Sequence, residues 1–246
     1  MYRNDKLSVI TDELNELGMP RMCSKLQEIV NTPDFMNTDS LSLFQEIIEA
    51  EYSERSTRRL QSHIKSAHLS TFTGGIEECK DSLKRSYRPN SIISTLSDLD
   101  FVKNGLNVCI LGPSDAGKTY LAKSLGILAC TKYRVEYTHC GKLLENLAAL
   151  KRQDFIKYKK KMNHYYRLDL LILDDFLLHS LTDEDEVKVL QDLLETRNES
   201  GRSIIVCSQR DPSSWAAMIR NDEGAANAIY KRATKHYTVV ITINPE

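Results

Sequence analysis

The residues most able to do chemistry form one short segment, Gly112-Pro113-Ser114-Asp115-Ala116-Gly117-Lys118-Thr119, which matches the pattern GxxxxGK[ST]. It follows the apolar run Val108 to Leu111 and opens a helical segment, Lys118 to Ala129. In such a loop, backbone N–H groups and the helix N-terminus bind phosphate oxygens, the lysine reaches the β- and γ-phosphates, and the hydroxyl binds Mg²⁺. We therefore expect ATP and Mg²⁺ as cofactors. The residues expected to bind the nucleotide are Gly112, Pro113, Ser114, Asp115, Ala116, Gly117, Lys118, Thr119 and Tyr120.

Asp115 is unusual in this loop, because an acid stands beside a polyanion at a position where glycine is common. Asp tolerates left-handed backbone angles better than most residues, so the loop can form. We expect the acid to reduce nucleotide affinity without abolishing binding.

Two adjacent acids follow the apolar run Leu170 to Leu173, at Asp174 and Asp175. A buried strand that ends in two carboxylates fits a site in which Asp174 supports the hydrated Mg²⁺ and Asp175 polarises the attacking water. The alternative is a strand that ends in a polar turn. With the phosphate loop two strands earlier, we expect Thr119 and Asp174 to be the metal ligands.

Further catalytic candidates lie near the next strand, Ser203 to Gln209. Gln209, ahead of Ser208, is a candidate sensor of the γ-phosphate, and an ordinary polar strand end is the alternative. Arg197 continues the helical stripe of Val187, Leu190 and Leu194. It either extends its charge to solvent at the helix end or points to an anion.

These residues must be positioned by a chain of 246 residues whose composition is that of a soluble globular protein, with 41% hydrophobic and 27% charged residues. The net charge of −1 excludes an all-basic protein but allows local basic patches. The six cysteines have no metal-ligand spacing, which predicts reduced thiols and a cytoplasmic location. Since every apolar run is far shorter than a membrane span, we expect no membrane insertion.

Five apolar runs alternate with helical segments after about residue 91: 107–111, 134–140, 168–173, 203–208 and 237–242. Runs without polar alternation are typical of parallel strands covered on both faces. The pattern predicts a doubly wound α/β domain, residues 91–246, with a parallel five-stranded sheet. Residues 1–90 have helical periodicity, which predicts an all-helical N-terminal domain. We expect this domain to serve as an adaptor and to bind DNA.

Charge is uneven along the helical part. Residues 1–54 hold 4 Lys and Arg against 11 Asp and Glu, a net charge of −7, whereas residues 55–88 hold 8 against 3, a net charge of +5. This change of sign indicates two faces with different partners, or simply solvated helix surfaces.

Two basic clusters are candidates for binding nucleic acid. Residues 151–167 carry seven Lys and Arg against one acid, interleaved with aromatic residues, and a second set lies on one helical face before residue 66. Neither cluster has a base-reading pattern, so we expect sequence-independent binding of duplex DNA, the alternative being solvated helices. The DNA-binding candidates are Arg55, Arg58, Arg59, Lys65, Lys151, Arg152, Lys157, Lys159, Lys160 and Lys161.

At this point the sequence resembles a known family, the IstB-like ATPases that assist insertion-sequence transposases, which are related to DnaC-type helicase loaders within the AAA+ class. The resemblance covers about Leu7 to Ile243. It rests on the opening LNELGMPRMCSKL, the helix ERSTRRLQSHIKSAHL, the phosphate loop, LLILDD, IIVCSQRDPSSW and the terminal AIYKRATKHYTVVI.

The resemblance implies a Mg²⁺-dependent ATPase that forms homo-oligomers on DNA and delivers target DNA to the transposase of the same insertion sequence. It also implies that Arg232 is an arginine finger supplied to a neighbouring subunit, and that Arg197 precedes the sensor strand. A replicative helicase loader and a nucleotide-gated DNA scaffold with little turnover are the alternatives.

Overall fold

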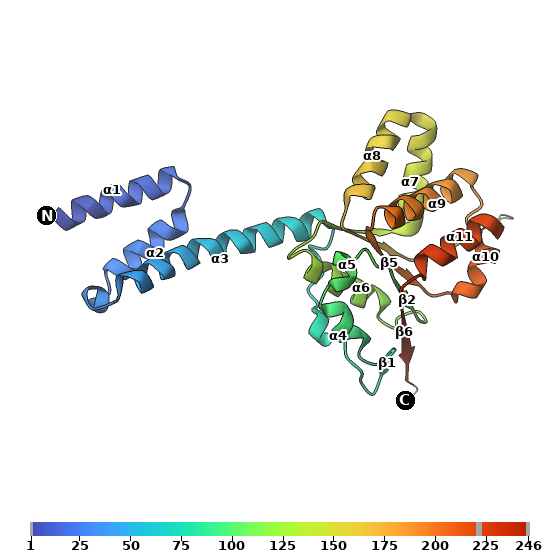
Figure 1. Ribbon diagram of the computed structural model, residues 1–246, viewed down its shortest axis with the longest axis horizontal. Helices are drawn as coiled ribbons and strands as arrows, with labels where there is room; N and C mark the ends of the chain where they lie inside the picture. The colour runs from blue at the N-terminus through green and yellow to red at the C-terminus, as the bar shows by residue number, and fades with distance from the viewer. Residues whose placement is uncertain (1, 220–222, 245–246) are drawn as a thin grey trace. The chain divides into compact units, whose positions relative to one another are not determined.

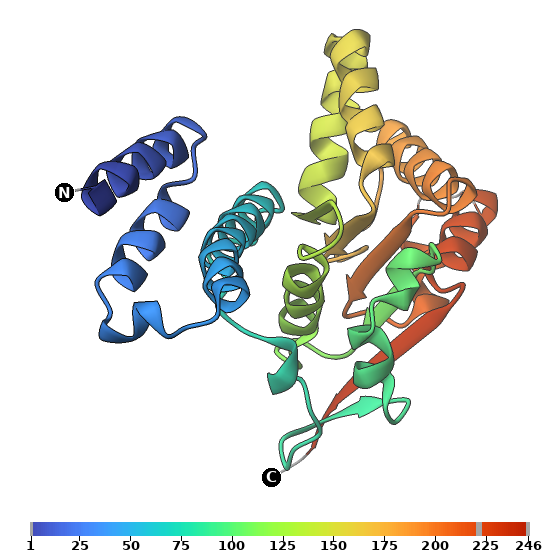
Figure 2. The ribbon, with the colours of Figure 1, turned by 60° about the vertical axis from the view of Figure 1, so that its left-hand side comes forward.

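The computed structural model describes residues 2–219 and 223–244, and its chain forms two compact units, Met1–Ser62 and His63–Glu246. Residues 63–90 thus belong to the same compact unit as the sheet. The sequence pattern predicted a domain boundary after residue 90. That functional division of the chain stays a prediction. Figures 1 and 2 show the elements of each unit.

The first unit is built from helices α1 (Tyr2–Glu16), α2 (Pro20–Val30) and most of α3 (Ser40–Ser66), with a short 3₁₀ turn at Pro33–Met36. The buried carboxylate of Glu51 in α3 accepts hydrogen bonds from the backbone N–H groups of Arg21 (2.9 Å) and Met22 (3.2 Å), and it pairs with Arg55. Burial acts to raise the pKa of Glu51, but these hydrogen bonds outweigh it and lower the pKa. Glu51 therefore satisfies the free N–H groups that open α2.

The predicted all-helical region extends only to Ser66, which is a correction to the expectation for residues 1–90. After α3 the chain is irregular, with a 3₁₀ turn at Ile76–Glu78, and then forms strand β1 (Arg85–Arg88). The strand has the sequence RSYR. Because it contains no apolar run, its pattern gives no strand signal.

The second unit contains one sheet with the strand order β1-β6-β2-β5-β4-β3. Strands β2 (Val108–Leu111), β3 (Val135–His139), β4 (Leu170–Asp174), β5 (Ser203–Ser208) and β6 (Tyr237–Ile243) are parallel, and β1 is antiparallel to β6. The fold class is confirmed. The sheet has six described strands, however, so the expected number of five was wrong. The strand that was not predicted is the polar edge strand β1.

Helices cover both faces of this sheet (Figures 1 and 2). Helices α4 (Ile92–Ser97), α5 (Asp100–Lys103) and α6 (Lys118–Ala129) lie on one side, and Ile172 of β4 faces α6. On the other side, Leu171, Leu173, Ile204 and Val206 join a core with α7 (Cys140–Gln153), α9 (Glu184–Glu199) and α11 (Glu223–Ala233). The short α10 (Trp215–Met218) completes this layer, with its Trp215 buried. Coverage on both faces explains the continuous apolar runs of the parallel strands.

The basic segment 151–167 lies between β3 and β4 and is divided between two helices, the end of α7 and α8 (Phe155–Arg167). Asp154 separates them, and its side chain caps α8 by accepting a hydrogen bond from the N–H of Lys157 at 3.0 Å. Tyr158, Met162 and Tyr165 bury one face of α8, which leaves its lysines on the outside.

All six cysteines are free thiols, as the sequence predicted. All six are also buried, and Cys109 and Cys207 lie in buried strands. Within the described parts of the chain, no helix combines the length and the apolar character needed to cross a membrane.

Candidate nucleotide and nucleic-acid sites

The phosphate loop lies between the end of β2 and the start of α6, as its sequence requires. Gly112 approaches β6 so closely that a Cβ there would lie 2.5 Å from the carbonyl oxygen of Ile241. Gly117 has a φ of 98°, a left-handed conformation that favours glycine. Asp115 has a φ of 60°, which confirms that this acid can occupy the turn.

Lys118 and Thr119 open α6 at the carboxyl edge of the sheet. The Lys118 ammonium is largely buried and donates a hydrogen bond to the carbonyl of Pro113 at 2.6 Å, and burial lowers its pKa. A charge held in a partly desolvated loop interacts strongly with an anion. The loop thus keeps a cation ready where phosphate oxygens would enter.

Asp174 is the centre of a buried hydrogen-bond network. Its Oδ2 accepts from the hydroxyl of Thr119 at 2.8 Å and from the phenol of Tyr137 at 2.6 Å, and its Oδ1 accepts from the N–H of Asp175 at 3.0 Å. The pKa of Tyr137 is raised by burial and by the bond to Asp174, so the phenol stays protonated and donates. The structure therefore brings Lys118, Thr119 and Asp174 together, as the sequence predicted.

The oxygen atoms of Thr119 and Asp174 fit a hard divalent cation such as Mg²⁺, which prefers oxygen ligands and usually keeps several waters. The described residues contain no group of three His, Cys, Asp or Glu side chains that could hold a metal ion unaided. This donor set suits a metal that is bound largely through phosphate oxygens and water.

Asp175 has an unpredicted partner, His139 at the end of β3. The Nδ1 of His139 lies 3.0 Å from Oδ2 of Asp175, and both side chains are partly exposed. Asp175 has a φ of 53°, which turns the chain sharply after β4. His139 could have been found from the sequence, because the carboxyl ends of neighbouring parallel strands meet at one sheet edge.

Tyr120 and Arg85 flank the phosphate loop. The Tyr120 hydroxyl donates to Glu78 at 2.6 Å, which raises the pKa of Tyr120 to about 12, and its ring packs edge-on against Phe72. A Cβ on Gly117 would lie 2.5 Å from Nη1 of Arg85, so this guanidinium borders the loop. No sequence pattern marks Arg85, since its strand contains no apolar run.

Arg197 takes neither of the positions expected for it. It is fully buried, and its guanidinium donates to the carbonyls of Tyr165, Leu168 (3.0 Å) and Ser203 (2.6 Å). Burial lowers its pKa. The geometry favours a structural role, joining the C-terminal end of α8 to the start of β5, over the predicted catalytic role.

The two sensor candidates, Gln209 and Ser208, and the predicted arginine finger, Arg232, differ in exposure. Gln209 is exposed directly after β5, whereas Ser208 is buried and donates to the carbonyl of Phe176 at 2.9 Å. Arg232, in α11, is mostly covered and pairs with Glu195 of α9 at 2.7 Å. A role for Arg232 in a neighbouring subunit stays a prediction.

The basic clusters divide into paired and unpaired cations. Lys151 pairs with Asp185, and Arg152 pairs with Asp183 and Asp185, at the start of α9. Lys157, Lys159, Lys160 and Lys161 are exposed, and within the described parts of the chain only Lys157 has an acidic partner, Asp154 at 3.0 Å. These four lysines are the stronger candidates for phosphate contacts.

The second predicted cluster lies along α3. Arg55 pairs with Glu51 and Arg58 with Glu54, each one helical turn away, at 2.7 and 2.8 Å. Arg59 and Lys65 are exposed. The paired arginines have less free charge to offer a phosphate.

Comparison with known proteins identifies the family. A family model described as IstB-like ATP binding protein matches residues 12–246. The chain belongs to this family. It is 29% identical to the ATP-binding protein of insertion sequence IS232 from Bacillus thuringiensis subsp. berliner, over 94% of this chain and 90% of that protein. It is also 30% identical to the insertion sequence ATP-binding protein y4pL of Sinorhizobium fredii, over 85% of this chain and 84% of that one.

Solved structures share the fold of this IstB-like protein. The DnaC helicase loader aligns with a TM-score of 0.53 at 19% identity, over 69% of this chain and 97% of that chain. AMPPCP-bound DnaA from Aquifex aeolicus aligns with a TM-score of 0.55 at 21% identity, over 68% of this chain and about half (49%) of that chain. The sheet and its helices therefore have the fold that these two proteins share.

Proposed function

We propose that this IstB-like protein is a Mg²⁺-dependent ATPase that oligomerises on duplex DNA and delivers target DNA to the transposase of its insertion sequence. The observation that carries the ATPase proposal is the hydrogen bond between Thr119 and Asp174, 2.8 Å long, beside the lysine of the phosphate loop. The names of the relatives as insertion-sequence ATP-binding proteins support the transposition role.

In the proposed reaction, Lys118 exchanges its bond to the carbonyl of Pro113 for a phosphate oxygen. Thr119 and Asp174 would hold Mg²⁺, which would supply neutralisation of the phosphate charge when bound. Tyr137 fixes the carboxylate of Asp174 by its hydrogen bond of 2.6 Å.

The attacking water is activated by Asp175, which accepts its proton. His139, 3.0 Å from this carboxylate, restricts the orientations that Asp175 can adopt. Arg232 of an adjacent subunit stabilises the charge that develops on the phosphoryl group, after release from Glu195.

DNA binding is assigned to the exposed lysines of α8, with Arg59 and Lys65 of α3 as a second patch. Because such contacts involve phosphates and no base edges, the protein would bind many target sequences. This suits a helper whose task is to present DNA to another enzyme.

One observation favours a second candidate, a nucleotide-gated DNA scaffold with little turnover. Asp115 places a carboxylate in the loop that would surround the phosphates, and this weakens the attraction for ATP. A scaffold would bind ATP and DNA yet release almost no phosphate.

The transposition role is tested by sizing the purified protein with ATP, with duplex DNA and with both, and then adding the transposase encoded beside it. We expect the largest assembly with both ligands, and we expect the transposase to join only that assembly. The proposal would be contradicted by a protein that has the same size with ATP, with DNA and with both, and that never captures the transposase.

A further inference from the structure

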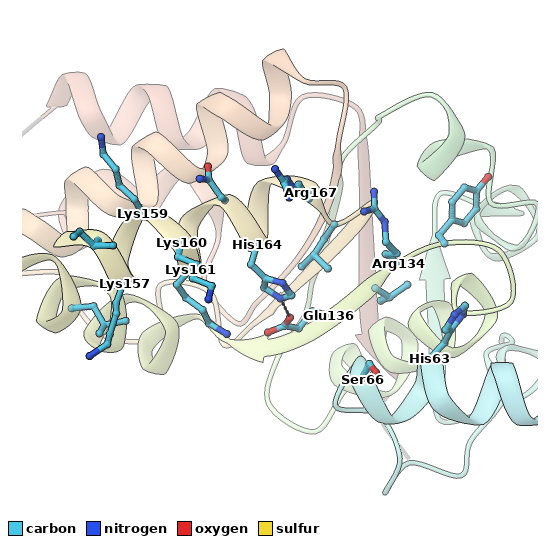
Figure 3. A pocket seen from close by; sticks show the side chains of 16 residues that line it. His63, Ser66, Arg134, Glu136, Lys157, Lys159, Lys160, Lys161, His164 and Arg167 are labelled. Atoms are coloured by element: carbon cyan, nitrogen blue, oxygen red, sulfur yellow. Dashed lines mark hydrogen bonds and ion pairs between the residues drawn. The ribbon is translucent and has the colours of Figure 1, made fainter. Parts of the chain in front are cut away.

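A groove with a volume of about 1040 Å³ lies beside the edge strand β3, between α8 and the last turn of α3, all within the second unit (Figure 3). Ligand sites in proteins commonly have volumes of about 300–1000 Å³. The groove therefore has room for more than one nucleotide.

One wall of the groove is a basic stripe of α8. Lys157, Lys160, Lys161, His164 and Arg167 line it, and at 100° per residue they share one helical face. Ten residues of helix separate the first from the last, a length of about 15 Å. Three lysines and one arginine of this wall thus present positive charge along the direction that a nucleic-acid backbone would follow.

The groove also has an apolar part of its lining, which we call its floor and which comprises Val135, Leu150 and Leu168. Tyr133, a half-buried aromatic residue, and the exposed Ile156 also line it. An intact duplex keeps its bases stacked inside and offers only phosphates and sugars to such a wall. A single strand offers bases as well, and these stack on aromatic and apolar surfaces.

Glu136 is the only acidic side chain among the described residues that line the groove. Its buried carboxylate lies 2.6 Å from Nε2 of His164, as the dashed line in Figure 3 shows. Because the histidine faces it directly, this acid presents little repulsion to an entering phosphate.

We infer that this groove binds an unpaired nucleic-acid strand, with phosphates along α8 and a base stacked on Tyr133. The inference rests on the proposed DNA binding and specifies its substrate: the exposed lysines attract DNA of any form, and the floor selects unstacked nucleotides. The protein would then hold a locally opened or distorted stretch of the target.

The test compares a labelled dT₁₂ strand with a duplex of 12 base pairs by fluorescence anisotropy, using the full-length protein at fixed salt. Tyr133→Ala should weaken strand binding roughly 5- to 150-fold, the range for removing one base stack, and leave duplex binding unchanged. Tyr133→Phe should retain strand binding. Tyr52→Ala, at an exposed tyrosine of the first unit, is the matched control and should change neither.

A second measurement needs no variant. A strand that carries 2-aminopurine should lose fluorescence when the parent protein binds it, since stacking quenches that base. Unchanged fluorescence on a bound strand, an equal loss of strand and duplex binding in Tyr133→Ala, or displacement of the strand by poly-glutamate as readily as by dT₁₂ would each overturn the inference. If duplex binds and strand does not, the inference fails alone; if neither binds, the proposed DNA function fails with it.

Discussion

The imidazole of His139, at the end of β3, lies 3.0 Å from the carboxylate of Asp175, at the end of β4. The two strands pair in register, and His139 is the partner of Asp174 in that pairing. The sheet therefore brings a histidine to the acid that we assign to water activation. This contact orients the carboxylate that we propose as the base, and it adds to the site a residue that no sequence motif contains.

The first prediction concerns His139→Ala. Losing one hydrogen bond of about 1 kcal/mol leaves Asp175 free to rotate, so kcat should fall about fivefold while the affinity for ATP is unchanged. Steady-state phosphate release and nucleotide titration measure the two quantities. An increase in kcat would mean that His139 holds Asp175 in an unproductive orientation.

Much of this site followed from sequence patterns that are local. The loop from Gly112 to Thr119 and the acids after β4 are contiguous segments whose spacing carries their chemistry. Arg85 and Tyr137 reach the site from strands distant in sequence, and only the sheet order reveals them. His139 did have a signal, because it is a polar residue near the end of a predicted strand. For Arg197 the sequence pattern led to the wrong role. Its position on an apolar stripe did not reveal the three backbone carbonyls to which its buried guanidinium donates.

The four exposed lysines of α8 lead us to predict an affinity for DNA that depends on salt. Replacing Lys157, Lys159, Lys160 and Lys161 by Gln should weaken duplex binding and reduce the slope of log affinity against log salt by about 0.9 for each phosphate that is no longer neutralised. The matched control is Lys151→Gln with Arg152→Gln, which should change the slope less, because both cations pair with acids of the α9 N-terminus. Equal slopes for the parent and the fourfold variant would assign α8 to solvent.

Asp169 predicts a pH-dependent stability. Its carboxylate accepts from the N–H of Arg134 (2.9 Å) and pairs with the guanidinium groups of Arg134 and Arg202. Burial acts to raise the pKa of Asp169, but the hydrogen bonds from Arg134 and the charges outweigh it and lower the pKa. A lowered pKa in the folded state means that the stabilisation is complete above the unfolded pKa, about 3.9, and is lost as the pH falls through the folded value.

Asp169→Asn should therefore lower the free energy of unfolding by about 1.5–3 kcal/mol at pH 7. The difference from the parent should narrow as the pH falls below about 4, which urea unfolding at several pH values would measure. Asp98→Asn, at an exposed position, should cost little at any pH. A constant difference between pH 7 and acid pH would show that the charge of Asp169 is not the stabilising feature.

Arg232 predicts complementation between subunits. If Arg232 completes the site of a neighbouring subunit, Arg232→Ala should still bind ATP. Its rate of ATP hydrolysis should fall roughly 10³- to 10⁵-fold, which corresponds to a barrier higher by on the order of 4–7 kcal/mol. Mixed with Lys118→Ala, which lacks a working site but keeps its arginine, it should regain part of the activity. If co-assembled mixtures stay inactive, Arg232 is better described as the structural partner of Glu195.

The most direct test of the central claim, that this site hydrolyses ATP, is the rate of phosphate release with Mg²⁺, with and without duplex DNA. We expect release by the parent, none by Lys118→Ala because ATP no longer binds, and bound ATP with release slowed about 10²- to 10⁴-fold in Asp175→Asn. Hydrolysis by Asp175→Asn at the parental rate would contradict the role of Asp175 as the base. ATP bound by the parent without any phosphate release, whether or not DNA is present, would contradict the central claim.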